Sequence, residues 1–280
     1  MSSRFIITLS CPDRPGIVAA LPHVLAENGF NITESQQYSD LESGQLFMRV
    51  ACEGAAAKDR LSAELDPLAA GFDMHLAVHE ADKKQRMLIL LSKFDHCLID
   101  LIYRQQSGSI NMDIAAIASN HETGRHWAEG AGLAYHGLGQ KQDKADNEAR
   151  LNALIDEAQI DLIVLARYMQ ILTPQFVARH EARIINIHHS FLPSFKGAEP
   201  YSQAHKRGVK IIGATAHFVT ADLDEGPIIA QGTEPVRHDM SVADLVDVGR
   251  DTERRTLARA VSLYAERRVF INGTKTVIFD

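Results

Sequence analysis

The segment that indicates the fold most directly is RIINIHHSFLP, residues 183–193. Its largely apolar, β-branched run, Ile184–Ile187, is typical of a buried strand. The pair Leu192-Pro193 ends whatever follows, because the residue before a proline disfavours helix. Asn186 and His188 stand two residues apart at the strand's end, so alternation places both side chains on the same side. An amide donor beside an imidazole is suited to stabilising a developing oxyanion.

The segment lacks a carboxylate, and the chain supplies a candidate further on, Asp224, in the turn-rich loop 220–227. Each of these three side chains also has an ordinary structural explanation, as a cap, a backbone-bonded residue or a turn former. We predict structural roles for His189 and His217. A metal site on His188, His189 and His217 is disfavoured, because the HExxH spacing and the thiolates typical of zinc sites are absent.

Outward from this segment, the chain from Met87 onward alternates short apolar strands with helical patterns. Such alternation predicts an α/β fold with a doubly wound, mostly parallel sheet. Ligand sites in these sheets lie at the carboxyl ends of strands, which is where Asn186 and His188 would lie. A capping box at Ser241 opens a long helix through Tyr264, and a hairpin closes the chain. The strands are expected at 87–91, 112–118, 133–136, 162–165, 184–187, 210–220 and 228–231, and the helices at 97–105, 124–130 and 143–159.

The turn between the first strand and helix of this sheet, residues 91–97 (LSKFDHC), contains no glycine. A phosphate cradle needs backbone amides that approach the ligand closely, which glycines permit. The sequence therefore argues against a dinucleotide or a P-loop nucleotide at this turn, and no cofactor is expected.

The first eighty residues follow a different pattern, which predicts a ferredoxin-like βαββαβ unit. Asp13, shortly before a proline, suits a helix N-cap, and the helix stops at Asn28-Gly29. The charged run 80–86 separates this unit from the rest, so we predict two domains, residues 1–82 and 83–280. The expected strands of the first domain are 4–9, 30–38, 45–52 and 72–78, and its second helix is 55–70.

This first domain resembles an ACT domain in its DRPGIV turn (residues 13–18), in the end of its first helix and in Asn31-Ile32. The resemblance implies an amino-acid effector site, with glycine and methionine the usual ligands, and a homo-oligomer assembled through these domains. The residues that would bind the effector are Asp13, Arg14, Pro15, Gly16 and Asn31. The same turn is equally well explained as a helix start without a ligand, because likeness in fold does not establish a site.

Composition narrows the classes of function. The 280 residues carry a net charge of −7 with a pI near 6.0, which argues against nucleic acid or an acidic membrane as partner. No apolar run is long enough to span a bilayer, and the N-terminus lacks the apolar region of a signal peptide. The cysteines Cys11, Cys52 and Cys97 are odd in number and have no CxxC spacing, so free thiols in a reducing cytoplasm are expected.

The second domain resembles the folate-dependent formyltransferase superfamily in three ordered motifs, NIHHSFLP at 186–193, TAHF at 215–218 and LDEGP at 223–227. The resemblance implies a catalytic trio that falls on Asn186, His188 and Asp224. The coincidence of motif, order and spacing outweighs the separate structural explanations. The resemblance also implies a pterin pocket lined by Arg167, Tyr168, Met169, Gln170, Ile171 and Leu172 and closed by Ala221, Asp222 and Leu223.

Members of this superfamily differ in the group that accepts the formyl unit. A phosphate-bearing acceptor would need a glycine-rich turn at 91–97, and a tRNA acceptor would need a basic surface. Water remains, with His96 and His121 as polar candidates for lining the acceptor pocket. The ACT-fused members imply hydrolysis of 10-formyltetrahydrofolate to formate and tetrahydrofolate, which serves one-carbon and purine metabolism. Formyl transfer to another acceptor and a non-catalytic folate-binding regulator are the alternatives.

Two residues depart from the superfamily pattern. Asp95 replaces a small residue, and Glu199 stands where a neutral or basic residue is more usual. Glu199 adds negative charge near the expected mouth of the site, which disfavours an anionic folate tail.

Overall fold

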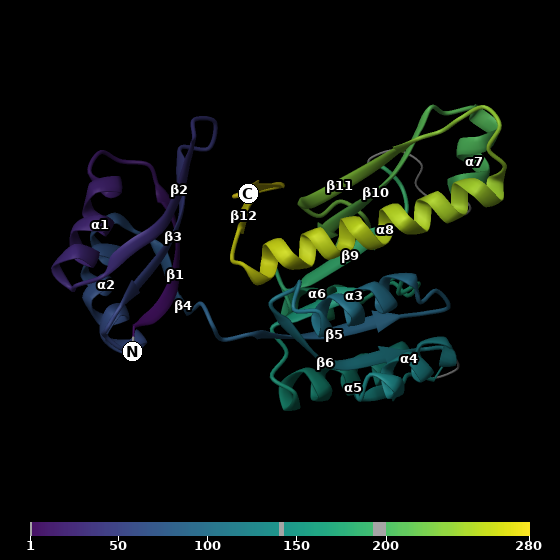
Figure 1. Cartoon of the computed structure of the whole chain (residues 1–280), viewed down its shortest axis with the longest axis horizontal. Coiled ribbons are helices and arrows are strands. Elements are labelled where there is room, and N and C mark those ends of the chain that lie inside the picture. The colour runs from purple at the N-terminus through teal and green to yellow at the C-terminus, as the bar shows by residue number, and fades with distance from the viewer. Residues whose placement is uncertain (1, 140–142, 193–199) are drawn as a thin grey trace. The chain divides into compact units, whose positions relative to one another are not determined.

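The structure is a computed structural model that describes residues 2–139, 143–192 and 200–280 (Figure 1). The chain divides into two compact units. The first holds the residues up to Lys84 together with Arg267–Asn272 and Val277–Asp280, and the second holds Gln85–Glu266 and Gly273–Thr276. The sequence places the boundary after residue 82, and two short segments from the end of the chain join the first unit.

The first unit is built on a four-stranded antiparallel sheet in the order β2-β3-β1-β4. Alternate residues of β1, such as Ile7 and Leu9, are buried and pack with Leu21 and Leu61 from the two helices. This arrangement confirms the predicted βαββαβ order. The elements are β1 (Ser3–Pro12), α1 (Ile17–Glu27), β2 (Asn31–Asp40), β3 (Gln45–Gly54), α2 (Lys58–Phe72) and β4 (His75–Glu80).

Two local predictions in this unit were wrong. The N-cap of α1 is Gly16 and not Asp13, because the backbone at Gly16 has a φ of 99°, a conformation that glycine adopts without strain. The backbone N–H of Asp13 donates instead to the carbonyl of Gly44. The last strand starts at His75 and not at residue 72, because α2 runs through Phe72 before the chain turns.

The end of the chain forms the predicted hairpin, β12 (Val269–Asn272) and β13 (Lys275–Ile278). Gly273 in its turn has a φ of 61°, as a tight hairpin turn requires. Within the first unit, the Phe270 ring packs edge-on against Phe47, with centroids 5.9 Å apart. The chain end thus packs an aromatic side chain against β3 of that unit.

The second unit contains a seven-stranded sheet in the order β11-β10-β9-β8-β5-β6-β7. The neighbouring strands β9, β8, β5, β6 and β7 are parallel to one another, and β10 runs antiparallel to both of its neighbours. This confirms the mostly parallel sheet. The strands are β5 (Gln85–Leu91), β6 (Met112–Ser119), β7 (Tyr135–Gly137), β8 (Leu162–Leu165), β9 (Ile184–His188), β10 (Ile211–Phe218) and β11 (Ile228–Pro235).

Helices pack on this sheet through apolar residues. Leu90 and Ile163 of the central strands are buried against Leu151 of α5 and Phe176 of α6. The long helix α8, yellow in Figure 1, packs on β9, β10, β11 and α3. The helices are α3 (His96–Gln106), α4 (Arg125–Gly130), α5 (Lys144–Glu157), α6 (Pro174–Arg179), α7 (Pro200–Arg207) and α8 (Val242–Ala265), with a 3₁₀ turn at Glu122–Gly124.

The chain changes direction across the sheet between β5 and β8. From β5 it proceeds outward through β6 and β7, and it then returns to β8 on the other side of β5. The carboxyl ends of β5 and β8 therefore flank a topological switch point, where ligands bind in sheets of this kind.

Three further points bear on the sequence predictions. The capping box at Ser241 is present, with its side chain accepting from the Asp244 N–H. The short helices α6 and α7 were not predicted, because six to eight residues carry little helical periodicity. None of the helices in the described part of the chain has the length and apolarity that crossing a bilayer requires.

Candidate active site

Asn186 and His188 occupy the carboxyl end of β9, two residues apart on the same side of the strand. Antiparallel pairing with β10 places His217 opposite Asn186 and Thr215 opposite His188. The buried Thr215 hydroxyl donates to the Ser190 carbonyl at 3.0 Å and accepts from the Leu192 N–H at 3.1 Å. The segment that leaves the strand is therefore held in place by hydrogen bonds from β10.

Asp224 lies in a loop that follows β10, and its carboxylate contacts His188 and His217. Its Oδ2 lies 3.2 Å from His188 Nδ1, and its Oδ1 lies 3.7 Å from His217 Nε2. The loop passes so close to β10 that a Cβ at Gly226 would lie 1.8 Å from the Phe218 carbonyl oxygen. Glycine is required there because no other residue fits. The structure thus brings Asn186, His188 and Asp224 into one group.

Electrostatics favour an ionised Asp224. The hydrogen bond from His188 lowers the pKa of this carboxyl below its usual value and outweighs the opposing effect of burial. The side chain is only 15% exposed, so water screens the pair weakly. A carboxylate in this position can hold the imidazole of His188 and attract a proton from water.

His217 orients the amide of Asn186. Its Nδ1 lies 2.8 Å from the Phe218 carbonyl and donates to it. Burial lowers the pKa of His217, so the ring is neutral at pH 7 and its Nε2 accepts a hydrogen bond. Nδ2 of Asn186 lies 3.2 Å from this Nε2 and donates to it, which leaves its second N–H for a ligand.

The other ring nitrogen of His188, Nε2, is buried and has no hydrogen-bond partner among the described residues. Buried polar atoms are almost always bonded, so an atom of this kind calls for a ligand or a water. Because Nδ1 faces Asp224, Nε2 is the nitrogen available to a bound molecule.

These residues line a cavity of about 270 Å³, most of whose wall is apolar. The segment after β8 and the loop before Asp224 form its other sides, and Met169, Ile171 and Leu223 expose large apolar surfaces there. Burial raises the pKa of Tyr168 to about 12, so its hydroxyl is neutral. Of the residues predicted to bind substrate, the cavity is lined by Arg167, Tyr168, Met169, Gln170, Ile171, Leu172, Ala221 and Leu223.

Three predicted substrate-binding residues do not line this cavity. Asp222 is exposed in the loop, where its carbonyl accepts from the Thr220 hydroxyl. Nδ1 of His121 lies 3.0 Å from Asn120 Oδ1. His96 lies at the start of α3 and bonds to Glu253, which sequence reasoning did not single out.

Glu253 is the centre of a buried polar network. It is 1% exposed, and its carboxylate accepts from His96 Nε2 at 2.9 Å, from the Tyr201 hydroxyl at 2.8 Å and from Arg167 at 3.3 Å. Burial acts to raise the pKa of Glu253, but the bonds and charges of these donors outweigh it and lower the pKa. In sequence Glu253 looks like part of a charged surface run, although it falls on the apolar stripe of α8, four residues before Leu257.

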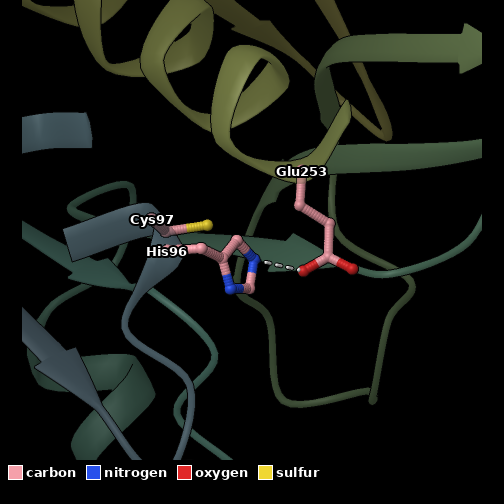
Figure 2. Close-up of side chains that lie close together, drawn as sticks. All are labelled: His96, Cys97 and Glu253. Carbon is pink, nitrogen blue, oxygen red and sulfur yellow. Dashed lines mark hydrogen bonds and ion pairs between the residues drawn. The ribbon is translucent and has the colours of Figure 1, made fainter. Parts of the chain in front are cut away.

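His96, Cys97 and Glu253 are close enough to hold a metal ion (Figure 2). Two observations favour hydrogen bonding instead. The Glu253 carboxylate already accepts from three donors, one of them the cationic Arg167, and burial raises the pKa of the Cys97 thiol, which disfavours the thiolate that metals bind. Figure 2 shows the His96 ring turned toward Glu253.

The wall of the cavity next to this network carries a neutral histidine. Burial, helped by the charge of Arg167, lowers the pKa of His189 to about 4. Its ring centroid lies 5.1 Å from that of His188 and 6.4 Å from that of Tyr201. Arg167 has a φ of 65°, and its guanidinium stacks on Phe94 at 5.2 Å.

The remaining candidates lie elsewhere. Asp95 accepts a hydrogen bond from the Trp127 indole at 2.9 Å. The five residues of the expected effector site, Asp13, Arg14, Pro15, Gly16 and Asn31, are all exposed, and Arg14 pairs with Asp73. Pro193 and Glu199 lie outside the described residues.

A doubly wound sheet that carries Asn186 and His188 at the end of β9, with Asp224 beside His188, is the arrangement that the resemblance to folate-dependent formyltransferases predicts. Residues 85–261 match the formyl transferase family, and residues 3–79 match the ACT domain family. The chain is 46% identical over 279 residues to a formyltetrahydrofolate deformylase of Corynebacterium sp. (strain P-1), and the match covers 98% of each protein. The chain therefore belongs to the formyltetrahydrofolate deformylase family.

Solved structures agree with this assignment. The crystal structure of formyltetrahydrofolate deformylase from Burkholderia mallei is 46% identical, with a TM-score of 0.96, and the match covers 99% of this chain and 100% of that one. Glycinamide ribonucleotide transformylase 1 from Symbiobacterium toebii is 33% identical, with a TM-score of 0.67, and the match covers 70% of this chain and 95% of that one.

Proposed function

We propose that this protein hydrolyses 10-formyltetrahydrofolate to formate and tetrahydrofolate. Full-length similarity to proteins of that activity supports the proposal. The observation that carries it is the pair of Asp224 and His188, whose buried Nε2 is left for a ligand at the wall of an apolar cavity. An apolar pocket with a few converging polar groups is the usual form of a small-molecule site.

The chemistry follows from the positions of three side chains. Asp224, held ionised by His188, positions a water and takes its proton as the water oxygen attacks the formyl carbon. Asn186 donates its second N–H to the oxyanion that forms. His188 in its imidazolium form donates from Nδ1 to Asp224 and from Nε2 to the oxyanion. The bond between the formyl carbon and N10 then breaks. The proton taken from water passes through the Asp224–His188 pair to N10, and formic acid ionises to formate in solution.

The substrate binds against the apolar walls of the cavity. We assign the pterin to the side formed by residues 167–172 and the loop at 221–224, because their exposed apolar side chains would be covered by a flat ring. The neutral His189 adds no charge at this wall, since its pKa is about 4.

A direct assay separates hydrolysis from the alternatives. Incubation with 10-formyltetrahydrofolate alone is expected to release formate and tetrahydrofolate in equal amounts, measured by a coupled formate assay and by the absorbance of the folate. A formyltransferase would release no formate, and it would form tetrahydrofolate only in step with the formylated product of an added acceptor. A non-catalytic folate-binding regulator would bind the compound and leave it unchanged.

We propose in addition that the ACT unit binds a small amino acid and assembles the protein into a homo-oligomer. The turn at residues 13–16 and Asn31 support this, because both are exposed and belong to the segment that matches the ACT domain family. Glycine and methionine are the candidate ligands. Each amino acid is titrated while the initial rate of formate release is followed, and one of the two is expected to change that rate. Flat responses to both would leave the unit with an assembly role alone.

We further propose that the protein acts in the cytoplasm, supplying formate to one-carbon and purine metabolism. The free, buried cysteines Cys11, Cys52 and Cys97 fit a reducing compartment.

A further inference from the structure

The crevice at the topological switch point is filled by the protein's own side chains. Ser92 follows β5, and its N–H donates to the carbonyl of Arg167, which follows β8. The Ser92 hydroxyl then accepts from the Met169 N–H at 3.0 Å and donates to Asn120 at 2.8 Å. These bonds join the ends of the two strands at the place where sheets of this type leave room for a ligand.

Glu253 closes the same crevice from α8. Its Oε2 accepts from His96, on the β5 side, and its Oε1 accepts from Arg167, on the β8 side. The Tyr201 hydroxyl, from α7, donates the third bond to this carboxylate, also at Oε1. Gly249, one turn before Glu253, makes this possible, because a Cβ there would lie 2.1 Å from the Tyr201 hydroxyl.

The filled crevice adjoins the candidate active site. Arg167 belongs both to the network and to the wall of the cavity, and the His189 ring contacts those of both His188 and Tyr201. A molecule that occupied the crevice would therefore lie beside the candidate active site. Neither His96, Glu253 nor Tyr201 lines the large cavity.

The chemistry of the network makes it a poor acceptor site. An amine acceptor would need a free carboxylate oxygen, but both oxygens of Glu253 already accept bonds from side chains. Displacing Arg167 would remove the cation paired with the buried Glu253 carboxylate, which is strongly unfavourable. Water is small enough to reach the formyl carbon without opening the network.

We propose that Glu253, with His96, Arg167 and Tyr201, determines acceptor specificity by filling the switch-point crevice and excluding organic amines, so that water is the only acceptor. This inference rests on the proposed hydrolysis. If the crevice were opened, the amine nitrogen would attack the formyl carbon, the bond from that carbon to N10 would break, and the proton lost by the amine would pass to N10.

The test measures how the formyl group is divided between two acceptors, water and an added amine. Wild type, His96→Ala and His96→Gln are incubated with 10-formyltetrahydrofolate and a large excess of glycinamide. Formate and N-formylglycinamide are quantified by mass spectrometry and corrected for the rate without enzyme. Glutamine retains a hydrogen-bond donor and much of the volume of histidine, so it is the matched control. The ratio of the two products does not depend on how fast each variant turns over.

We expect wild type and His96→Gln to form almost entirely formate, with only a trace of N-formylglycinamide. His96→Ala should raise the share of N-formylglycinamide about tenfold or more, the discrimination that one missing group in a pocket commonly carries. Tyr201→Ala with Tyr201→Phe as its control gives a second pair if His96→Ala does not fold, as judged by circular dichroism.

Two results would overturn the inference. One is wild type that formylates glycinamide as readily as the opened variant, and the other is a folded, active His96→Ala or Tyr201→Ala with an unchanged product ratio. Neither result is the same as failure of the proposed function, which would appear as wild type that releases no formate in the absence of glycinamide.

Discussion

Replacing Asp224 with asparagine is expected to lower kcat about 10²- to 10⁴-fold, the range that a positioned general acid or base contributes. Asparagine keeps the shape of the side chain but cannot take a proton from water or carry the charge that faces His188. Initial rates of formate release measure the effect. Asp222→Asn is the matched control, because Asp222 is exposed in the same loop and does not line the cavity. Equal rates for Asp224→Asn and wild type would exclude the carboxylate from the chemistry.

The same variant has a pH signature. The pKa of Asp224 is lowered in the folded protein, so the bond to His188 stabilises the fold above the unfolded pKa of about 3.9 and is lost as pH falls through the folded pKa. The difference in the free energy of unfolding between wild type and Asp224→Asn should therefore be largest near neutral pH and shrink below about pH 4. Urea unfolding at several pH values measures it. A difference that grows on acidification would contradict the pairing.

Removing Asn186 or His188 by substitution with alanine is expected to lower turnover about 10²- to 10³-fold, because each loses a donor to the oxyanion worth roughly 2.7–4 kcal/mol. The fold should survive, since both side chains lie at the end of β9 and not in its apolar core. Steady-state kinetics with 10-formyltetrahydrofolate separate kcat from KM. His205→Ala, at an exposed position on α7, is the control. Activity close to that of wild type in either variant would remove that residue from the mechanism.

The order of the elements could be read from the sequence because it depends on local pattern. Apolar, β-branched runs such as Leu162–Leu165 predict buried strands, and the capping box at Ser241 predicts the start of α8. The wrong predictions concerned the ends of elements, which are set by backbone conformation. At Gly16 the positive φ moves the helix start, and no side-chain pattern reports it.

The candidate site divides in the same way. Asn186 and His188 could be placed on one side of a strand end, because alternation within a strand is a local property. The approach of Asp224 depends on how tightly the loop at Gly226 passes β10, which spacing in the sequence does not give. His96 and His121 were expected beside the acceptor, but His96 is bonded to Glu253 and His121 to Asn120.

The sequence by itself determined the two kinds of sheet, the strand that carries Asn186 and His188, and the absence of a glycine-rich turn after β5. These follow from periodicity and residue type, which act over a few neighbouring positions. Only the tertiary structure decided that Glu253, in a run that looks like a charged surface, is buried among His96, Arg167 and Tyr201. The reason is physical: such a carboxylate is stable in the interior only where donors from distant segments converge on it, and that convergence exists only in the folded chain.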